Sequence, residues 1–300
     1  MTRPVAVGVQ VPEAERTVTW PEYVGMARAA DDVGLDSVWM GDHLLYRADE
    51  EGPERGPFDA WTILAGLAAV TRRVRLGPLV ACTAFLAPGV LARRAATVDA
   101  IADGRLTLGL GAGWNRPEFE AFGLPFDHRA ARFEESFQIV RRLLAGERVT
   151  FDGTYHRTRD AVLLPRPERL PRLMIGSLGD RVLTATLPWV DAWNAWGPWC
   201  GNTPEGFAEV NERITDLAVG VGRYPDTVDR SVCVYAEVGP TPDDVWFVED
   251  APPLRGSPGE IAAGIRGFAE AGADEVILVL NVVTEETIRS LGAVLEVLDA

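Results

Sequence analysis

The sequence predicts one (β/α)8 barrel formed by residues 1–300. Short apolar segments rich in β-branched residues alternate with longer amphipathic segments along the chain, which is typical of a parallel sheet covered by helices. The same helix-to-strand turn also occurs near both ends of the chain. Finally, 300 residues, of which 47% are hydrophobic, supply the core that one large barrel needs.

Four β/α units are expected in the first half of the chain. The first helix has the clearest start, because Thr19 and Glu22 have the spacing of a capping box and Pro21 stands in the first turn. This helix is expected to end at Val33, where Gly34 follows. Strands are expected at residues 5–10, 37–40, 75–81 and 106–110, and the later helices at residues 59–70 and 89–102.

Four further units are expected in the second half, where Ser257 and Glu260 have the spacing of a second capping box. Strands are expected at residues 173–175, 192–194, 230–236 and 275–280, and helices begin near Asp180, Glu205, Ser257 and Thr284. Segments 30–38 and 269–276 share one pattern: the end of a helix, a glycine, an acidic residue and a strand. Their positions near the two ends suit a sheet that closes on itself.

Long connections interrupt this alternation, with insertions after strands 2, 4 and 7 and a shorter connection after strand 6. They cover residues 41–57, 111–128, 196–204 and 237–255, together with a hairpin at residues 149–171 whose turn is Asp152-Gly153. The main insertion region is expected at about residues 111–171. Because most of these segments follow the carboxyl ends of strands, where barrels of this kind build their active sites, we expect a site made of loops there.

Composition excludes several classes of function. The net charge of −15 disfavours binding to nucleic acid or to anionic membranes. All 29 basic residues are arginine, which excludes lysine Schiff bases and the P-loop lysine. Cys82, Cys200 and Cys233 lack the spacing of a metal site, so no metal is expected. No signal peptide and no apolar run of ~18 residues is found, and a cytoplasmic location is expected.

Asp42 and His43 directly follow the second predicted strand. A histidine at this place can exchange a proton near neutral pH, and the aspartate can orient or tune its ring. A solvated pair of loop residues is the alternative.

Two glycine-rich turns follow later strands. Residues 109–115 (Gly-Leu-Gly-Ala-Gly-Trp-Asn) lack the third glycine of a dinucleotide fingerprint, because that place is Trp114. They suit a close approach of the backbone to a flat ring, or a simple tight turn. In residues 176–181, backbone N–H groups, Ser177 and Arg181 suit a phosphate, with a plain loop as the alternative.

Three tryptophans, Trp193, Trp196 and Trp199, stand close together around the sixth predicted strand. Such a cluster forms part of a substrate pocket in some proteins and belongs to the core or to a subunit contact in others.

Several of these segments together resemble the bacterial-luciferase-like superfamily. The resemblance rests on residues 38–43 (Val-Trp-Met-Gly-Asp-His), 109–115, 122–126 (Phe-Gly-Leu-Pro-Phe), the Gly176-Ser177 turn and 190–194 (Val-Asp-Ala-Trp-Asn), in this order over nearly the whole chain. Within the superfamily, the chain is most similar to oxidoreductases that use the deazaflavin F420. Relatives that use FMN share the barrel.

The resemblance implies a cofactor ring at the carboxyl ends of the strands, a non-prolyl cis peptide between Leu79 and Val80, and a homodimer. It implies His43 and Asp42 as catalytic residues and Arg47, Trp114 and Trp193 as contacts of a small-molecule substrate. The implied cofactor contacts are Asp42, Leu79, Val80, Ala81, Gly111, Gly113, Trp114, Asn115, Gly176, Ser177, Gly179 and Arg181.

Three functions follow as hypotheses. The first is an F420-dependent oxidoreductase in which His43 handles the proton that accompanies a hydride. The second is an FMN-dependent monooxygenase, and the third is a barrel that binds a cofactor without catalysis. Members that oxidise sugar phosphates carry a glutamate at the place of Trp114 and use lysines for the phosphate, so such a substrate is not expected here.

Overall fold

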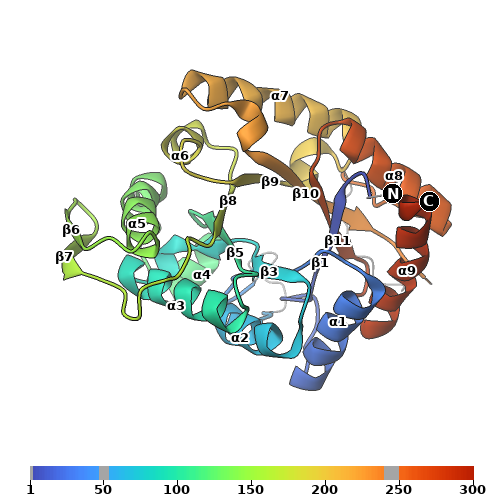
Figure 1. Cartoon of the computed structure of the whole chain (residues 1–300), viewed down its shortest axis with the longest axis horizontal. Coiled ribbons are helices and arrows are strands. Elements are labelled where there is room, and N and C mark those ends of the chain that lie inside the picture. The colour runs from blue at the N-terminus through green and yellow to red at the C-terminus, as the bar shows by residue number, and fades with distance from the viewer. Residues whose placement is uncertain (1–2, 47–53, 240–249) are drawn as a thin grey trace.

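The computed structural model describes residues 3–46, 54–239 and 250–300, and in them nine strands form one parallel sheet that curves into a ring (Figure 1). The strands are β1 (Ala6–Gln10), β2 (Ser37–Met40), β3 (Arg75–Pro78), β4 (Ala81–Cys82), β5 (Thr107–Gly111), β8 (Arg172–Gly176), β9 (Ala192–Trp196), β10 (Asp229–Ala236) and β11 (Glu275–Leu280). Their order around the ring is β3-β2-β1-β11-β10-β9-β8-β5-β4, and a parallel bridge between Leu76 and Leu106 joins β3 to the segment before β5. Since β3 and β4 are two parts of one predicted strand, the eight-stranded barrel is confirmed.

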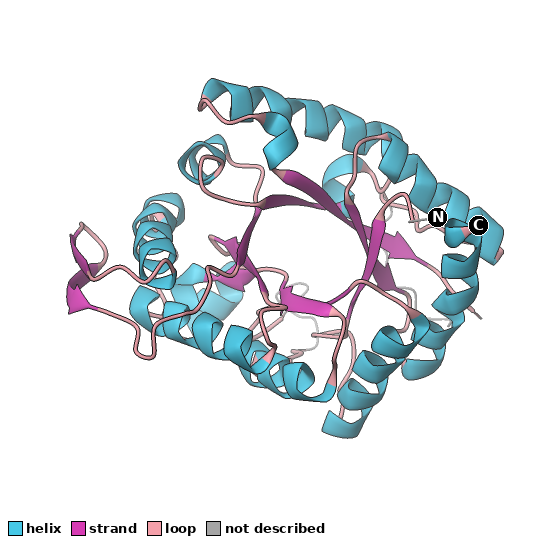
Figure 2. Ribbon diagram, in the orientation of Figure 1, coloured by secondary structure: helices cyan, strands magenta, loops and turns pink. Residues whose placement is uncertain are grey.

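Helices surround the ring on its outer side, as Figure 2 shows. They are α1 (Trp20–Val33), α2 (Ala60–Val70), α3 (Pro88–Ile101), α5 (Arg129–Leu144), α6 (Asp180–Thr186), α7 (Pro204–Gly220), α8 (Pro258–Glu270) and α9 (Glu285–Asp299). The short segments η1 (Thr83–Phe85), η2 (Gly197–Cys200) and η3 (Pro225–Thr227) are 3₁₀ turns. Both termini of the described chain lie on the same side of the barrel.

The predicted starts of two helices are confirmed in atomic detail. At α1 the backbone N–H of Thr19 donates to the Glu22 carboxylate over 2.8 Å, and at α8 Ser257 and Glu260 form the same contact over 2.7 Å. These bonds satisfy backbone groups that the first turn of a helix leaves without partners.

The repeated turn is confirmed at both ends of the chain. Gly34 and Gly272 have φ angles of 95° and 94°, which a side chain would strain. Two residues further on, the carboxylates of Asp36 and Asp274 accept the backbone N–H groups of Val7 and Arg230 over 2.8 and 2.7 Å. Each turn therefore ties its strand to the start of a neighbouring strand.

The predicted insertion between β5 and β8 contains more regular structure than expected. The segment predicted as a loop, 111–128, includes the short helix α4 (Arg116–Ala121). The hairpin of β6 (Val149–Asp152) and β7 (Arg157–Ala161) lies outside the ring of helices, beside α5 (Figure 1). The carboxylate of Glu135 on α5 accepts three backbone N–H groups of the hairpin turn, from Thr154, Tyr155 and His156.

Alternation along the strands decides which side chains enter the barrel. Trp39, Met174, Cys233 and Ile277 form a separate inner cluster, whereas their strand neighbours pack outward against the helices. Toward the carboxyl ends, this inner cluster is completed by Tyr235, Val279 and the half-buried Leu79, Val80 and Trp196. The mouth of the barrel thus has an apolar centre.

Candidate active site

His43 lies in the loop after β2, held by a carboxylate that comes from a distant part of the chain. Its Nδ1 atom lies 3.1 and 3.2 Å from the two carboxylate oxygens of Glu118 on α4. The backbone N–H of Leu44 donates to the same carboxylate over 3.0 Å. Glu118 is only 1% exposed, so it is a fixed partner that orients the imidazole. Among the described residues, no hydrogen bond engages the Nε2 atom of His43, which leaves that atom available for a proton transfer.

The surroundings of His43 stabilise its protonated form. Burial alone would lower the pKa of this histidine, but the hydrogen bond to Glu118 opposes that effect. The negative charges of Glu13, Glu118 and Asp42 act in the same direction as the hydrogen bond. Together they raise the pKa of His43 to about 9. An imidazolium at neutral pH is a proton donor, so the site favours reactions in which the product gains a proton.

Asp42 has one of the two roles predicted for it, since it tunes His43 through its charge but does not hold the ring. Its carboxylate accepts the backbone N–H of Cys82 over 3.1 Å and so ties the loop after β2 to β4. Burial raises the pKa of Asp42 to about 7. The prediction that Asp42 orients the ring of His43 is wrong, because Glu118 holds Nδ1; the effect of Asp42 on His43 is through its charge.

Glu13, which sequence analysis did not single out, adds another acid with a buried carboxylate oxygen to this group. A Cβ atom placed on Gly41 would lie 1.1 Å from its Oε2, so the carboxylate occupies the space that the glycine leaves. Burial raises the pKa of Glu13 to about 7. Glu13 and Asp42, each with a pKa of about 7, therefore stand close to His43.

Two aromatic side chains surround His43. The ring of Trp114 meets the imidazole edge to face at 5.6 Å between centroids, and Tyr46 does so at 5.7 Å. Trp114 is 61% exposed although it touches His43, whose side chain is only 14% exposed, and this suits a contact with a bound molecule. Arg47, predicted to contact the substrate, lies outside the described residues.

The centre of the mouth is formed by Leu79 and Val80, joined by a cis peptide bond as the resemblance implied. Val80 points into the barrel, where Cβ atoms placed on Gly109, Gly111 and Gly176 would lie 2.9, 2.6 and 3.0 Å from its side chain. These glycines therefore make room for Val80, which corrects the expectation that they let the backbone approach a ring directly. Ala81 is fully buried on the outer side of the sheet.

Gly113 and Asn115 shape the loop after β5. Gly113 has a φ of 78°, and a Cβ atom there would lie 2.6 Å from Phe119 and 2.7 Å from Cys82. Asn115 is 3% exposed and its amide donates to the backbone oxygen of Leu45 over 2.8 Å. Its side chain ties this loop to the loop that carries His43, and the contact of Asn115 with the cofactor stays a prediction.

Trp193 is not part of the mouth, and the prediction that it contacts the substrate is wrong. Its side chain is fully buried on the outer side of β9, stacked on Phe207 at 6.3 Å, and its indole N–H donates to the backbone oxygen of Ser177. Trp196, three residues later, has the opposite orientation and meets Tyr235 edge to face at 5.5 Å inside the barrel.

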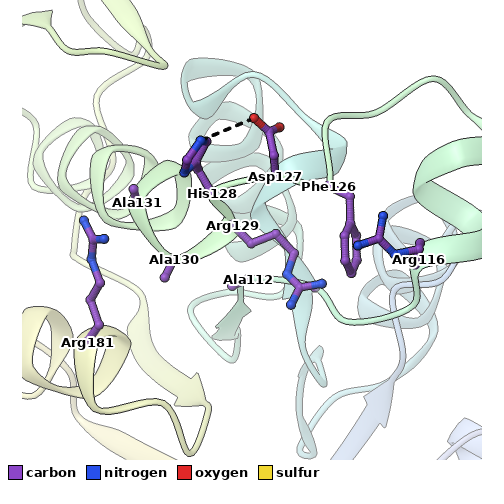
Figure 3. Close-up of a pocket in the computed structure, with 10 residues that line it drawn as sticks. Ala112, Arg116, Phe126, Asp127, His128, Arg129, Ala130, Ala131 and Arg181 are labelled. Atoms are coloured by element: carbon purple, nitrogen blue, oxygen red, sulfur yellow. Dashed lines mark ion pairs between the residues drawn. The ribbon is translucent and has the colours of Figure 1, made fainter.

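A cavity of about 460 Å³ lies between the loop after β5, the start of α5 and Arg181. Figure 3 shows Arg116 and Arg129 on either side of the Phe126 ring, at 4.0 and 3.7 Å from its centroid. The Nη1 atom of Arg129 is buried and has no hydrogen-bond partner among the described residues. The first turn of α5 and the carboxylate of Asp127 also line this cavity. The start of a helix and an arginine without a hydrogen-bonded partner are features that favour binding of an anion.

The predicted phosphate turn beside this cavity is less free than expected. The hydroxyl of Ser177 accepts the backbone N–H of Gly179 over 3.1 Å, and Arg181 forms two bonds of 2.6 and 2.7 Å with Glu134. Gly176 lies against Val80. Among the described residues that line the cavity, Arg129 is the cation with a buried nitrogen that lacks a hydrogen-bond partner.

Comparison with known proteins identifies the family. A family model described as luciferase-like monooxygenase matches residues 4–254. The chain belongs to the luciferase-like monooxygenase family. The resemblance inferred from the sequence is thereby confirmed.

Three curated proteins with similar sequences are named as a ketoreductase, a monooxygenase and a dehydrogenase, which are kinds of oxidoreductase. The chain is 30% identical over 273 residues to a phthiodiolone/phenolphthiodiolone dimycocerosates ketoreductase of Mycobacterium sp., covering 84% of this chain and 70% of that protein. It is 37% identical over 170 residues to pyrimidine monooxygenase RutA of Methylobacterium radiotolerans, covering 55% of this chain and 44% of that protein. It is 40% identical over 156 residues to the F420-dependent glucose-6-phosphate dehydrogenase of Beutenbergia cavernae, covering 50% of this chain and 45% of that protein. The chain thus spans less than half the length of the last two.

Solved structures support the fold of this luciferase-like chain. Monooxygenase RslO1 from Streptomyces bottropensis has a TM-score of 0.80 at 26% identity, covering 99% of this chain and 100% of that one. The F420-dependent tetrahydromethanopterin reductase from Methanopyrus kandleri has a TM-score of 0.76 at 19% identity, covering 96% and 97%. Among the described residues, no helix is long and apolar enough to cross a membrane, and no group of three metal-binding side chains occurs.

Proposed function

We propose that this protein is an F420-dependent oxidoreductase that reduces the carbonyl group of a small, uncharged substrate. The observation that carries the proposal is the pair of His43 and Glu118 at the mouth of the barrel, which holds an imidazolium in a fixed orientation. In carbonyl reduction, the oxygen gains a proton while the carbon gains a hydride, and His43 supplies that proton from Nε2.

The residues of the mouth fit a deazaflavin. Val80 and Leu79 offer an apolar surface at the centre of the barrel, and the Arg129 cavity offers a cation for a phosphate or carboxylate at one side. When bound, F420 supplies a hydride at C5 of its ring. The loop residues Trp114 and Tyr46 shield His43 from water, which strengthens its hydrogen bond to Glu118.

Two relatives support this choice of reaction. The ketoreductase aligns over 84% of this chain, and the F420-dependent dehydrogenase is 40% identical over the part that it shares. An FMN-dependent monooxygenase is the second candidate, because the pyrimidine monooxygenase is 37% identical over 170 residues. The homodimer implied by the resemblance stays a prediction.

A parallel titration of the cofactor-free protein with F420 and with FMN distinguishes these candidates. The quenching of tryptophan fluorescence reports binding, since Trp114 and Trp196 border the mouth. We expect F420 to bind more tightly than FMN by about tenfold or more, which corresponds to about 1.4 kcal/mol. Tighter binding of FMN would favour the monooxygenase.

Replacing Arg129 with glutamine tests the anion site in the same titration. Loss of one charged hydrogen bond costs about 1.5–3 kcal/mol, so the affinity for F420 should fall about 10- to 100-fold. The affinity for the deazaflavin chromophore without its phosphate should not change. Arg157→Gln is the matched control, because Arg157 lies on the outlying hairpin with its side chain 78% exposed. Equal losses for both ligands would contradict the assignment.

A further inference from the structure

Two amide side chains on neighbouring strands point into the barrel near its mouth. In β1, Gly8 faces the interior, because a Cβ atom there would lie 2.2 Å from the hydroxyl of Ser37. Gln10, two residues later, has the same orientation. In β11, Val279 belongs to the inner cluster, so Asn281 also points inward. The two strands pair directly, with Val9 beside Leu278.

Both amides are buried without full hydrogen bonding. Gln10 is 3% and Asn281 6% exposed, and among the described residues neither Gln10 Oε1 nor Asn281 Nδ2 has a partner. Asn194, another inward-facing amide, differs: its Nδ2 donates to Ser231 over 3.0 Å, and its Oδ1 accepts from Cys233. Buried polar groups are almost always paired in a folded protein, so one free acceptor and one free donor on adjacent strands require an explanation.

The chemistry of the pair indicates what would complete it. A hydroxyl group is the smallest uncharged group that both donates to an oxygen and accepts from an N–H. A carboxylate cannot donate to Gln10, so it would leave that oxygen without a partner. An alkyl group would leave both amides unpaired.

We propose that Gln10 and Asn281 bind a hydroxyl group of the substrate, so that the preferred substrates are hydroxy ketones. The hydroxyl donates to Gln10 Oε1 and accepts from Asn281 Nδ2. In the sheet, β2 is the neighbour of β1 on the side away from β11, and His43 follows β2. The carbonyl of the same molecule then extends from the two amides toward His43. Naming the substrate as a ketone rests on the proposed function; the hydroxyl site rests on the two amides alone.

Matched ketones test the substrate preference. With reduced F420 and no oxygen, 3-hydroxybutan-2-one should be reduced with a kcat/KM at least about tenfold above that of butan-2-one, because the plain ketone leaves the amides unpaired. Gln10→Met and Asn281→Leu keep the side-chain volume and should bring the ratio close to one. A ratio that stays unchanged in both variants would overturn the proposal, as would a wild-type preference for butan-2-one.

Thermal unfolding without ligand keeps the test independent of the reaction. Gln10→Met removes an unpaired buried oxygen and should raise Tm by about 2 °C or more. The control Asn194→Leu removes a satisfied amide and should lower Tm. A fall in Tm for Gln10→Met would show that its oxygen is paired within the protein and would overturn the hydroxyl site. If neither ketone is reduced but the Tm of Gln10→Met rises as expected, the proposed ketone reduction is wrong, and the unpaired oxygen of Gln10 is confirmed.

Discussion

Replacing His43 with alanine should lower kcat for carbonyl reduction by about 10²-fold or more, because the reaction loses its proton donor. The measurement is the anaerobic oxidation of reduced F420 by a ketone, followed by absorbance. Binding of F420 should change much less than kcat, since the Arg129 cavity is intact in the variant.

His156→Ala is the matched control. His156 lies in the turn between β6 and β7, on the hairpin outside the ring of helices. Its replacement should leave kcat nearly unchanged. An unaltered rate in the His43 variant would remove this residue from the mechanism.

Replacing Glu118 should separate its charge from its hydrogen bond. Glu118→Gln keeps an oxygen that accepts from His43 Nδ1 and from the N–H of Leu44, but it removes the negative charge that raises the pKa of His43. In the wild type, the rate of reduction should fall as pH rises through about 9, because the proton donor is then lost. In Glu118→Gln this decline should begin about one pH unit lower or more.

Glu118→Ala should have the larger effect. It removes one partner of a buried pair, which costs about 3–5 kcal/mol of stability, and it frees the imidazole to rotate. We expect kcat to fall by about 10²-fold in the folded fraction, with thermal unfolding as the check on folding. A pH profile of Glu118→Gln that coincides with the wild type would show that Glu118 has only a structural role.

The barrel itself was predictable from local chemistry. The capping boxes at Thr19 and Ser257 and the glycine-acid turns at Gly34 and Gly272 involve residues close in sequence, so their patterns mark the ends of helices directly. The position of His43 also followed from its place after a strand. The cis bond at Leu79 came only from the resemblance.

The partners in the site were not predictable in the same way. Glu118 lies 75 residues from His43, and it stands on a six-residue helix with no clear signal in the sequence. Trp193 and Trp196 face opposite sides of β9, and since both sides of a barrel strand are buried, apolar residues alone do not set the orientation. Such contacts depend on how distant segments pack.

The central claim is that His43, held by Glu118, donates a proton while a hydride passes from reduced F420 to a carbonyl group. The most direct measurement mixes the protein, reduced F420 and 3-hydroxybutan-2-one without oxygen and follows cofactor oxidation and alcohol formation as pH is varied. We expect one alcohol formed for each F420 oxidised, at a rate that falls as pH rises through about 9. Cofactor oxidation that requires oxygen, or a rate that increases through that pH, would contradict it.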